Sequence, residues 1–445
     1  MRSVRLRRVL AATVFVAVLL APTAAIANGW VLERGLLGGL FANTVWAAPD
    51  VSGHWAVYLS RNTVAIPSLY ALSKVDLRTG ASSVVAADVT DGIESPAVDG
   101  DWVAYAVGGD IHVENLVTGA VKKATDDGAT TAESDPVVSG KYVVWESDSG
   151  AGSDIWGKDF TSTHAKFLIA GGAGNQMQPS IHGAHVAYRD ESAGDTQGQI
   201  MLKTIGSSAA AVNLTNNTDD QFLPSIGDHL VAWLALNTSG RAMIRYHNFD
   251  TGENLSGPSD PDYSIANPQV SGDRILYDIP SGSNRDMYVF DVRAWRASGG
   301  GIPLSFAMPN TNQDELEGKI SGNACVYLSN GSPTWARLAV PGLSIGSVPT
   351  RVPHHGHIHL KGTLTDQSVP IGYAPLRVEK YSGGKWVKVK TITTSASGAY
   401  SYQTPTLHSK TNYRVAYDGR AAVAFNPGIA RHFSAVSAVR TGWPR

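Results

Sequence analysis

The ten residues PVVSGKYVVW at positions 136–145 decide the fold of this chain, because closely related stretches recur along it. In each stretch a proline or glycine begins a short apolar strand, a turn containing glycine follows, and an alternating strand ends on an aromatic residue. Glycine permits the positive φ that a tight hairpin turn needs. The copies are PDVSGHWAVY (49–58), PAVDGDWVAY (96–105), PVVSGKYVVW (136–145), PSIHGAHVAY (179–188), PSIGDHLVAW (224–233), PQVSGDRILY (268–277) and GKISGNACVY (318–327).

The spacing of these copies predicts the architecture. Their final aromatic residues lie 40 to 50 positions apart, and each hairpin is followed by a third strand and a weaker fourth one. Four strands per repeat of this length are typical of a β-propeller blade, which must pack against neighbouring blades to bury its faces. The sequence therefore predicts an all-β protein with a seven-bladed β-propeller of four-stranded blades. Residues 31–41 are expected to supply the last blade's fourth strand, and an open ring is the alternative.

The repeats resemble those of the TolB-type β-propeller family. The resemblance rests on the proline, the glycine turn, the apolar-aromatic strand and third strands such as DIHVENL, DIWGKDF and DMYVFDV, and it covers residues 49–342. It departs at the turn, where SG, DG or HG replaces the Ser-Pro-Asp-Gly usual in that family. The family contains periplasmic scaffolds, surface proteins and a few lyases, so the resemblance implies a fold and leaves the activity open.

The chain after the repeats predicts a second domain. Residues 343–352 are expected to form a linker, and residues 353–445 a small β-sandwich of short alternating strands. Their KGTLT stretch (361–365), the strand around Trp386 and the YRVAYDG stretch (413–419) resemble the immunoglobulin-like modules of secreted proteins from Gram-positive bacteria of the actinobacterial type. The matching residues are core and turn positions, so they imply no catalytic role.

The N-terminus predicts export. Residues 1–27 combine four arginines, an apolar run and small residues at a cleavage site, as in a secretory signal peptide, so that the propeller domain spans residues 28–342. An uncleaved anchor is the alternative. No later segment has the roughly 18 apolar residues of a membrane-spanning helix, so no such segment is expected in the mature chain. The lone Cys325 is expected to be a buried apolar residue. The protein is therefore expected to be secreted and cell-wall associated.

The two domains carry opposite charge. Residues 343–445 contain 13 basic and three acidic residues, whereas residues 28–342 contain 19 basic and 35 acidic residues. A basic module is suited to an anionic wall polymer. Two other interpretations remain open, namely docking on its own acidic propeller and simple solubility. The expected partner is an extracellular protein or cell-wall polymer, with no nucleic acid, and the protein is expected to be a monomer.

Two groups of side chains are candidates for binding. Acidic residues in the loops between blades are expected to form a negative rim at one mouth of the channel, and a merely solvated loop face is the alternative. Histidines on the strand after the linker are expected to share one face and to offer imidazoles to a divalent metal, with adventitious binding as the alternative. The rim residues are Asp91, Glu94, Asp126, Asp127, Asp135, Asp219, Asp220, Asp262, Asp314 and Glu315, and the histidines are His355, His357 and His359.

No catalytic constellation is evident in the sequence, and no cofactor is expected apart from an adventitious divalent metal. The strands that lead into the channel are expected to offer mainly Pro, Val, Ile, Ser and Gln. The main interpretation is therefore a secreted, non-catalytic binding or scaffold protein whose acidic propeller face holds a ligand while the basic module associates with the cell wall. The alternative is a propeller enzyme, a lyase or hydrolase that acts on polysaccharide at the channel mouth.

Overall fold

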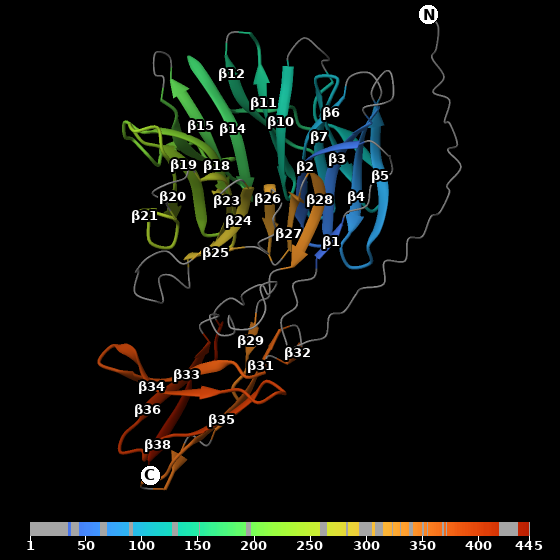
Figure 1. Cartoon of the computed structure of the whole chain (residues 1–445). Coiled ribbons are helices and arrows are strands. Elements are labelled where there is room, and N and C mark those ends of the chain that lie inside the picture. The colour runs from blue at the N-terminus through green and yellow to red at the C-terminus, as the bar shows by residue number, and fades with distance from the viewer. Residues whose placement is uncertain are drawn as a thin grey trace, which may run out of the picture.

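The chain folds as an all-β protein (Figure 1). Within the described residues, seven four-stranded antiparallel sheets each carry one copy of the repeat, and two further sheets form the C-terminal domain. This arrangement confirms the predicted β-propeller. The computed structural model describes residues 34–36, 44–62, 69–88, 92–126, 132–150, 152–192, 197–258, 265–281, 284–292, 305–307, 315–322, 324–329, 331–337, 341–348, 351–353, 355–366, 369–370, 372–417 and 435–444. The predicted signal peptide, residues 1–27, lies outside them.

Each propeller sheet is a meander whose strands pair in chain order. The first three sheets consist of β2 (Thr44–Ser52), β3 (Trp55–Asn62), β4 (Leu69–Asp76) and β5 (Ala81–Asp88); β6 (Ile93–Asp99), β7 (Trp102–Val107), β8 (Asp110–Asn115) and β9 (Val121–Lys123); and β10 (Ala132–Ser139), β11 (Tyr142–Asp148), β12 (Ser153–Asp159) and β13 (Phe167–Ala170). The next three consist of β14 (Gly174–His182), β15 (His185–Ser192), β16 (Gln199–Thr204) and β17 (Val212–Asn213); β18 (Asp220–Ile226), β19 (Leu230–Leu236), β20 (Ala242–Asn248) and β21 (Glu253–Ser256); and β22 (Ala266–Ser271), β23 (Arg274–Ser281), β24 (Asn284–Asp291) and β25 (Ser305–Ala307).

The last propeller sheet joins the two ends of the repeat region. It contains β26 (Glu315–Ser321), β27 (Ala324–Ser329) and β28 (Ser332–Arg337), and its fourth strand is β1 (Arg34–Leu36), which pairs antiparallel with β28. Val326 of this sheet packs in one buried cluster with Val51 and Tyr58 of the first sheet. The N-terminal segment therefore completes the last sheet, and the first and last sheets share a core.

The aromatic residue that ends each repeat is a packing residue between neighbouring sheets. Tyr105 packs with Val57 and Leu72 of the preceding sheet. Burial of such large rings supplies much of the contact that a four-stranded sheet cannot make alone. All seven of these rings are at most 4% exposed, namely Tyr58, Tyr105, Trp145, Tyr188, Trp233, Tyr277 and Tyr327.

Every first strand contains a bulge next to its proline or glycine. The pairing of β10 with β11 shifts register between Ser134 and Val137, and the other six first strands show the same irregularity. Bulges of this kind redirect side chains, and a positive φ at a residue other than glycine is a strained conformation. Six residues at this position have φ between 47° and 55°: Ser95, Asp135, Gln178, Leu223, Asn267 and Glu317.

The C-terminal domain consists of two sheets around one core. Leu360, Leu364 and Tyr400 from one sheet pack with Val378 and Val415 from the other. No helix among the described residues is long and apolar enough to cross a membrane. One sheet contains β29 (Pro341–Leu343), β31 (His359–Asp366), β32 (Val369–Pro370) and β35 (Ala399–Gln403), and the other contains β30 (Arg351–Val352), β38 (Arg440–Pro444), β36 (Thr411–Tyr417), β33 (Pro375–Ser382), β34 (Lys385–Thr393) and β37 (Ala435–Val436).

Candidate functional site

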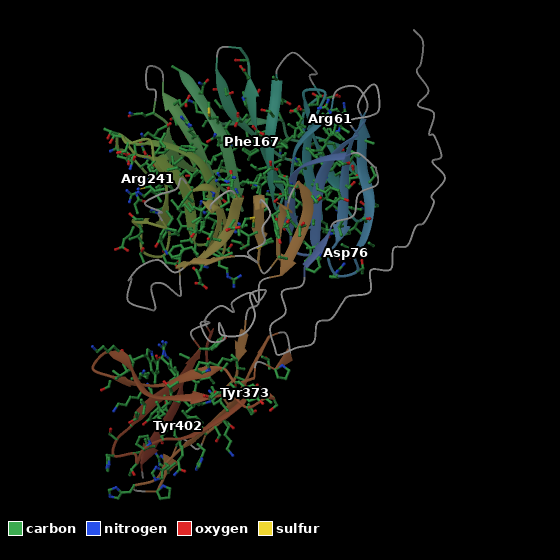
Figure 2. The ribbon with its side chains drawn as sticks, in the orientation of Figure 1. Arg61, Asp76, Phe167, Arg241, Tyr373 and Tyr402 are labelled. Atoms are coloured by element: carbon green, nitrogen blue, oxygen red, sulfur yellow. The ribbon has the colours of Figure 1, made fainter. Side chains whose placement is uncertain are left out.

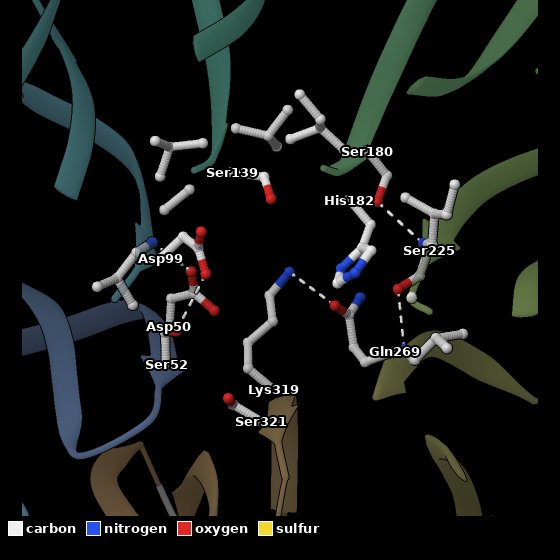
Figure 3. A pocket seen from close by; sticks show the side chains of 18 of the residues that line it. Asp50, Ser52, Asp99, Ser139, Ser180, His182, Ser225, Gln269, Lys319 and Ser321 are labelled. Atoms are coloured by element: carbon white, nitrogen blue, oxygen red, sulfur yellow. Dashed lines mark hydrogen bonds between the residues drawn. The ribbon is translucent and has the colours of Figure 1, made fainter. Parts of the chain in front are cut away.

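The first strands of the seven propeller sheets surround a central channel, a cavity of about 600 Å³. Two positions of each repeat, the residues immediately after the proline and two places further on, supply most of its polar lining (Figure 3). The prediction that this lining is mainly Pro, Val, Ile, Ser and Gln is incomplete, because ionisable residues also line it. These are Asp50, Asp99, Asp135, His182, Asp228 and Lys319.

The side chains that precede the turn glycine hold neighbouring sheets together. The Gly100 N–H donates to Ser52 Oγ at 3.0 Å, and the Gly140 N–H donates to Asp99 Oδ2 at 2.7 Å. The Gly53 N–H donates to Ser321 Oγ at 3.2 Å and so links the first sheet to the last. These bonds satisfy turn N–H groups that would otherwise lack a protein partner. Serine and aspartate at this position are therefore structural.

The residues that follow the proline form a second polar group in the channel (Figure 3). Asp50 Oδ2 accepts the Val98 N–H at 2.7 Å, and Lys319 Nζ donates to Gln269 Oε1 at 3.0 Å. Burial raises the pKa of the Asp50 carboxyl, although the Lys319 ammonium and backbone N–H groups oppose this shift. Asp50 and Lys319 belong to the first and last sheets, so only ring closure brings them together. We interpret Asp50 and Lys319 as part of the junction between the first and last sheets rather than as residues that react with a substrate.

A carboxyl group with different properties lies behind the channel lining, at the bulged ends of the first strands. Glu146 on β11 is half-buried and accepts the backbone N–H of Gln178, the bulge residue of the next sheet. The pKa of Glu146 is raised to about 7, mainly by burial; the Gln178 N–H opposes the shift, and the neighbouring Asp135 carboxylate adds to it. Asp135 is exposed, lines the channel and accepts the Ser95 hydroxyl at 2.7 Å. One carboxyl that can hold a proton near neutral pH thus lies near a solvated carboxyl that lines the channel.

Glu146 also stands out among the equivalent residues of the other repeats. The position after the final aromatic residue is charged in two further sheets, as Arg189 and Asp278. Arg189 pairs with Asp220 at 3.0 Å, and Asp278 pairs with Arg285 at 2.6 Å. Among the residues that the structure describes, no cation lies within ion-pair distance of Glu146. Unneutralised, partly buried carboxyls with a shifted pKa are candidates for acid–base chemistry.

The predicted acidic rim is only partly visible. Asp91, Asp127, Asp262 and Asp314 lie outside the described residues, and the same holds for the side chain of Glu315. The five that are described lie in different settings, and of these Asp135 alone lines the channel. Glu94 is exposed on β6, Asp126 forms an ion pair with Lys123 at 2.5 Å, Asp219 lines a separate pocket, and Asp220 is paired with Arg189. Binding by the rim as a whole stays a prediction.

The histidines after the linker do not share one strand, because β31 begins only at His359. His355 and His357 precede it, so the expected common face is not formed. The His355 ring lies edge-on to His408, with centroids 5.3 Å apart, and His357 Nδ1 is 2.8 Å from the Thr404 carbonyl oxygen. No group of three metal-binding side chains was found among the described residues. Metal binding by these histidines stays a prediction.

Glu146 was not among the residues predicted from the sequence, although the alignment of the repeats marks it as unusual. Alignment of the seven repeats shows that the residue after the final aromatic is Leu or Ala in four copies. A glutamate in the third copy, Glu146, departs from that apolar pattern. What the alignment does not show is its partner, because the neighbouring Asp135 and Gln178 come from bulges of two different sheets.

Comparison with known proteins shows the fold. No protein-family model and no curated protein sequence matches the chain. Among solved structures, it is similar to the β-propeller domain of the Trilobed protease from Pyrococcus furiosus (10% identity, 67% of this chain and 94% of that chain, TM-score 0.51). It is also similar to an oligogalacturonate lyase in complex with manganese (12% identity, 70% and 96% coverage, TM-score 0.50). TolB from Acinetobacter baumannii also matches (17% identity, 54% and 60% coverage, TM-score 0.39), too weakly to carry an argument.

These comparisons overturn the main functional prediction. The similar structures with TM-scores of at least 0.50 include a protease's propeller domain, peptidases and a lyase, so the prediction of a non-catalytic binding or scaffold protein is contradicted. The chain spans 58% of the length of the acylaminoacyl peptidases that it matches. Identities this low show a shared fold and not a shared reaction. The reaction must be argued from the site itself.

Proposed function

We propose that the protein is a glycan-cleaving enzyme whose active site lies at the channel mouth beside Glu146. The observation that carries this proposal is the half-buried Glu146 carboxyl, with its pKa raised to about 7, next to the solvated Asp135. Glycoside hydrolysis uses two carboxyl groups in such different environments, one as the acid and the other as the base or nucleophile.

The proposed reaction is hydrolysis of a glycosidic bond. Glu146 in its protonated form donates a proton to the leaving oxygen as the bond between that oxygen and the anomeric carbon breaks. Water adds to the anomeric carbon, and its proton passes to the Asp135 carboxylate. Proton exchange with solvent then restores both groups. Gln178 positions the acid, because its backbone N–H donates to the Glu146 carboxyl.

The test is cleavage of a panel of soluble neutral, acidic and amino-sugar polysaccharides. New reducing ends without ultraviolet absorbance indicate hydrolysis, whereas an absorbing unsaturated product indicates elimination. We expect E146Q to lose at least about a hundredfold in kcat, because general acid catalysis contributes on that order. D126N is the matched control, since Asp126 is exposed, pairs with Lys123 and is not among the groups that act on Glu146. Full activity of E146Q, or cleavage of peptides and of no glycan, would overturn the proposal.

We further propose a seven-bladed ring closed by β1, an immunoglobulin-like C-terminal module, and export directed by residues 1–27. Support for the ring comes from the seven repeat-bearing sheets and from the β1–β28 pairing. Support for export comes from the arginines and apolar run at the N-terminus. N-terminal sequencing of protein recovered from the medium tests the last point, and a chain that retains its first 27 residues contradicts it.

A further inference from the structure

A second pocket lies on the sheet β18–β21, away from the channel. It has a volume of about 240 Å³ and shares no lining residue with the channel. Its apolar wall includes Leu214, Trp233 and Ala235, which are at most 6% exposed, and the partly buried Leu255. The polar lining includes Arg245 and Asp219. A pocket of this size suits one amino acid or one sugar unit, because drug-sized ligands occupy about 300–1,000 Å³.

The equivalent place in the sheet β10–β13 shows what this pocket lacks. There, the cross-strand neighbour of Trp145 is Trp156, and Lys166 Nζ lies 5.5 Å from the centre of a Trp156 ring. The same lysine pairs with the buried Glu133 at 3.1 Å. An aromatic ring and a lysine thus occupy this part of the sheet.

In β18–β21 both groups are replaced. The cross-strand neighbour of Trp233 is Arg245, and Gln221 takes the place of the buried glutamate. The indole N–H of Trp233 donates to Gln221 Oε1 at 2.7 Å, so the amide substitutes for the carboxylate at the indole but needs no lysine to neutralise it. The sheet β10–β13 therefore fills with side chains the place where β18–β21 has a pocket.

Some polar groups on the pocket wall have hydrogen-bond partners within the protein for all their donors, whereas others lack an ion-pair partner among the described residues. Gln221 Nε2 donates to Asn217 Oδ1 at 2.8 Å and to the Asp219 carbonyl at 3.1 Å, so Gln221 has no spare donor. Arg245 is half-buried and donates to Ser256 Oγ. Within the part of the chain that the structure describes, neither the Arg245 guanidinium nor the Asp219 carboxylate has an ion-pair partner. The pocket thus offers one cation and one anion for recognition.

We propose that this pocket binds a small organic carboxylate that also carries a hydrogen-bond donor, with the carboxylate on Arg245 and the donor on Asp219. A guanidinium recognises carboxylates through paired N–H donors, and such charge-assisted bonds are among the strongest. Two sources share this chemistry: an amino acid, whose donor is an ammonium, and a uronic acid, whose donors are hydroxyls. The proposal does not depend on the reaction at the channel mouth.

The test is titration of the full chain with L-alanine, with D-glucuronate and, as the uncharged comparison, with D-glucose, followed by calorimetry or ligand-observed NMR. We expect saturable binding of at least one carboxylate and not of glucose. Preference for alanine identifies an amino acid site, and preference for glucuronate identifies a sugar-acid site. R245Q should weaken binding at least about tenfold, because it removes the charged donor.

Arg241, the residue immediately before β20, provides the matched control and is labelled in Figure 2. It does not line the pocket, so R241Q removes the same charge and should bind as the unchanged protein does. R245W, which copies the Trp156 arrangement, should abolish binding, and D219N should weaken alanine more than glucuronate. Absence of binding by both carboxylates, equal binding of glucose, or unchanged affinity in R245Q would overturn the proposal.

Discussion

The E146Q substitution should stabilise the protein above neutral pH. The Glu146 carboxyl ionises near pH 4.5 in the unfolded chain, whereas burial raises its pKa to about 7 in the folded protein. Between these values the folded state retains a proton that the unfolded state releases, so the free energy of unfolding falls as the pH rises. The difference corresponds to at most about 3 kcal/mol, because each tenfold change in an ionisation constant is worth about 1.4 kcal/mol.

Glutamine at position 146 avoids the cost of ionising a buried carboxyl and keeps the hydrogen bond from the Gln178 N–H. Its side-chain oxygen can still accept the Gln178 N–H, and its amide never has to ionise beside Asp135. We therefore expect E146Q and the unchanged protein to be equally stable near pH 4, below both pKa values. At pH 8, E146Q should be more stable by about 2–3 kcal/mol. Loss of activity with a gain of stability is the usual pattern for a strained catalytic group.

Urea unfolding followed by tryptophan fluorescence at pH 4, 6 and 8 measures this difference. E94Q is the control, because Glu94 is an exposed glutamate on β6, and its substitution should leave the pH dependence unchanged. If E146Q and the unchanged protein have the same free energy of unfolding at pH 8, Glu146 is not held protonated by burial. That result would also remove the observation on which the proposed acid rests.

Three further outcomes are expected. K166M should cost about 3–5 kcal/mol in urea unfolding, because it removes the cation from the buried Glu133; a loss below about 1 kcal/mol would show that the ion pair contributes little. G362A should destabilise the C-terminal domain by about 3 kcal/mol in calorimetry, since a Cβ atom there would meet the Ser344 carbonyl oxygen; an unshifted transition would contradict the close approach. Burial raises the pKa of the Cys325 thiol to about 12, so the folded protein should not react with a disulfide reagent until denaturant is added, and prompt reaction would show that the thiol is accessible.

The strands of the propeller were predictable because their signals are local. The glycine turns, the alternating strands and the buried aromatic residues all lie within single repeats, and the structure places all seven aromatic rings inside the core. The pairing of β1 with β28 was also predictable, since a last repeat with three strands requires a fourth from elsewhere. The expected histidine face failed because the chain around His357 bonds to the Thr404 carbonyl before β31 begins, and periodicity does not reveal such a contact.

The amino-acid sequence by itself determined the repeat, the all-β architecture and the order of the strands, because turn conformation and side-chain alternation depend on neighbours in the chain. Only the tertiary structure decided which polar groups meet. Asp50 and Lys319 become neighbours through ring closure, and Glu146 meets Asp135 and Gln178 where two sheets adjoin. The chemistry of these groups depends on burial and on partners from neighbouring sheets, namely Lys319 for Asp50 and the Gln178 N–H for Glu146, and the single repeat does not encode either.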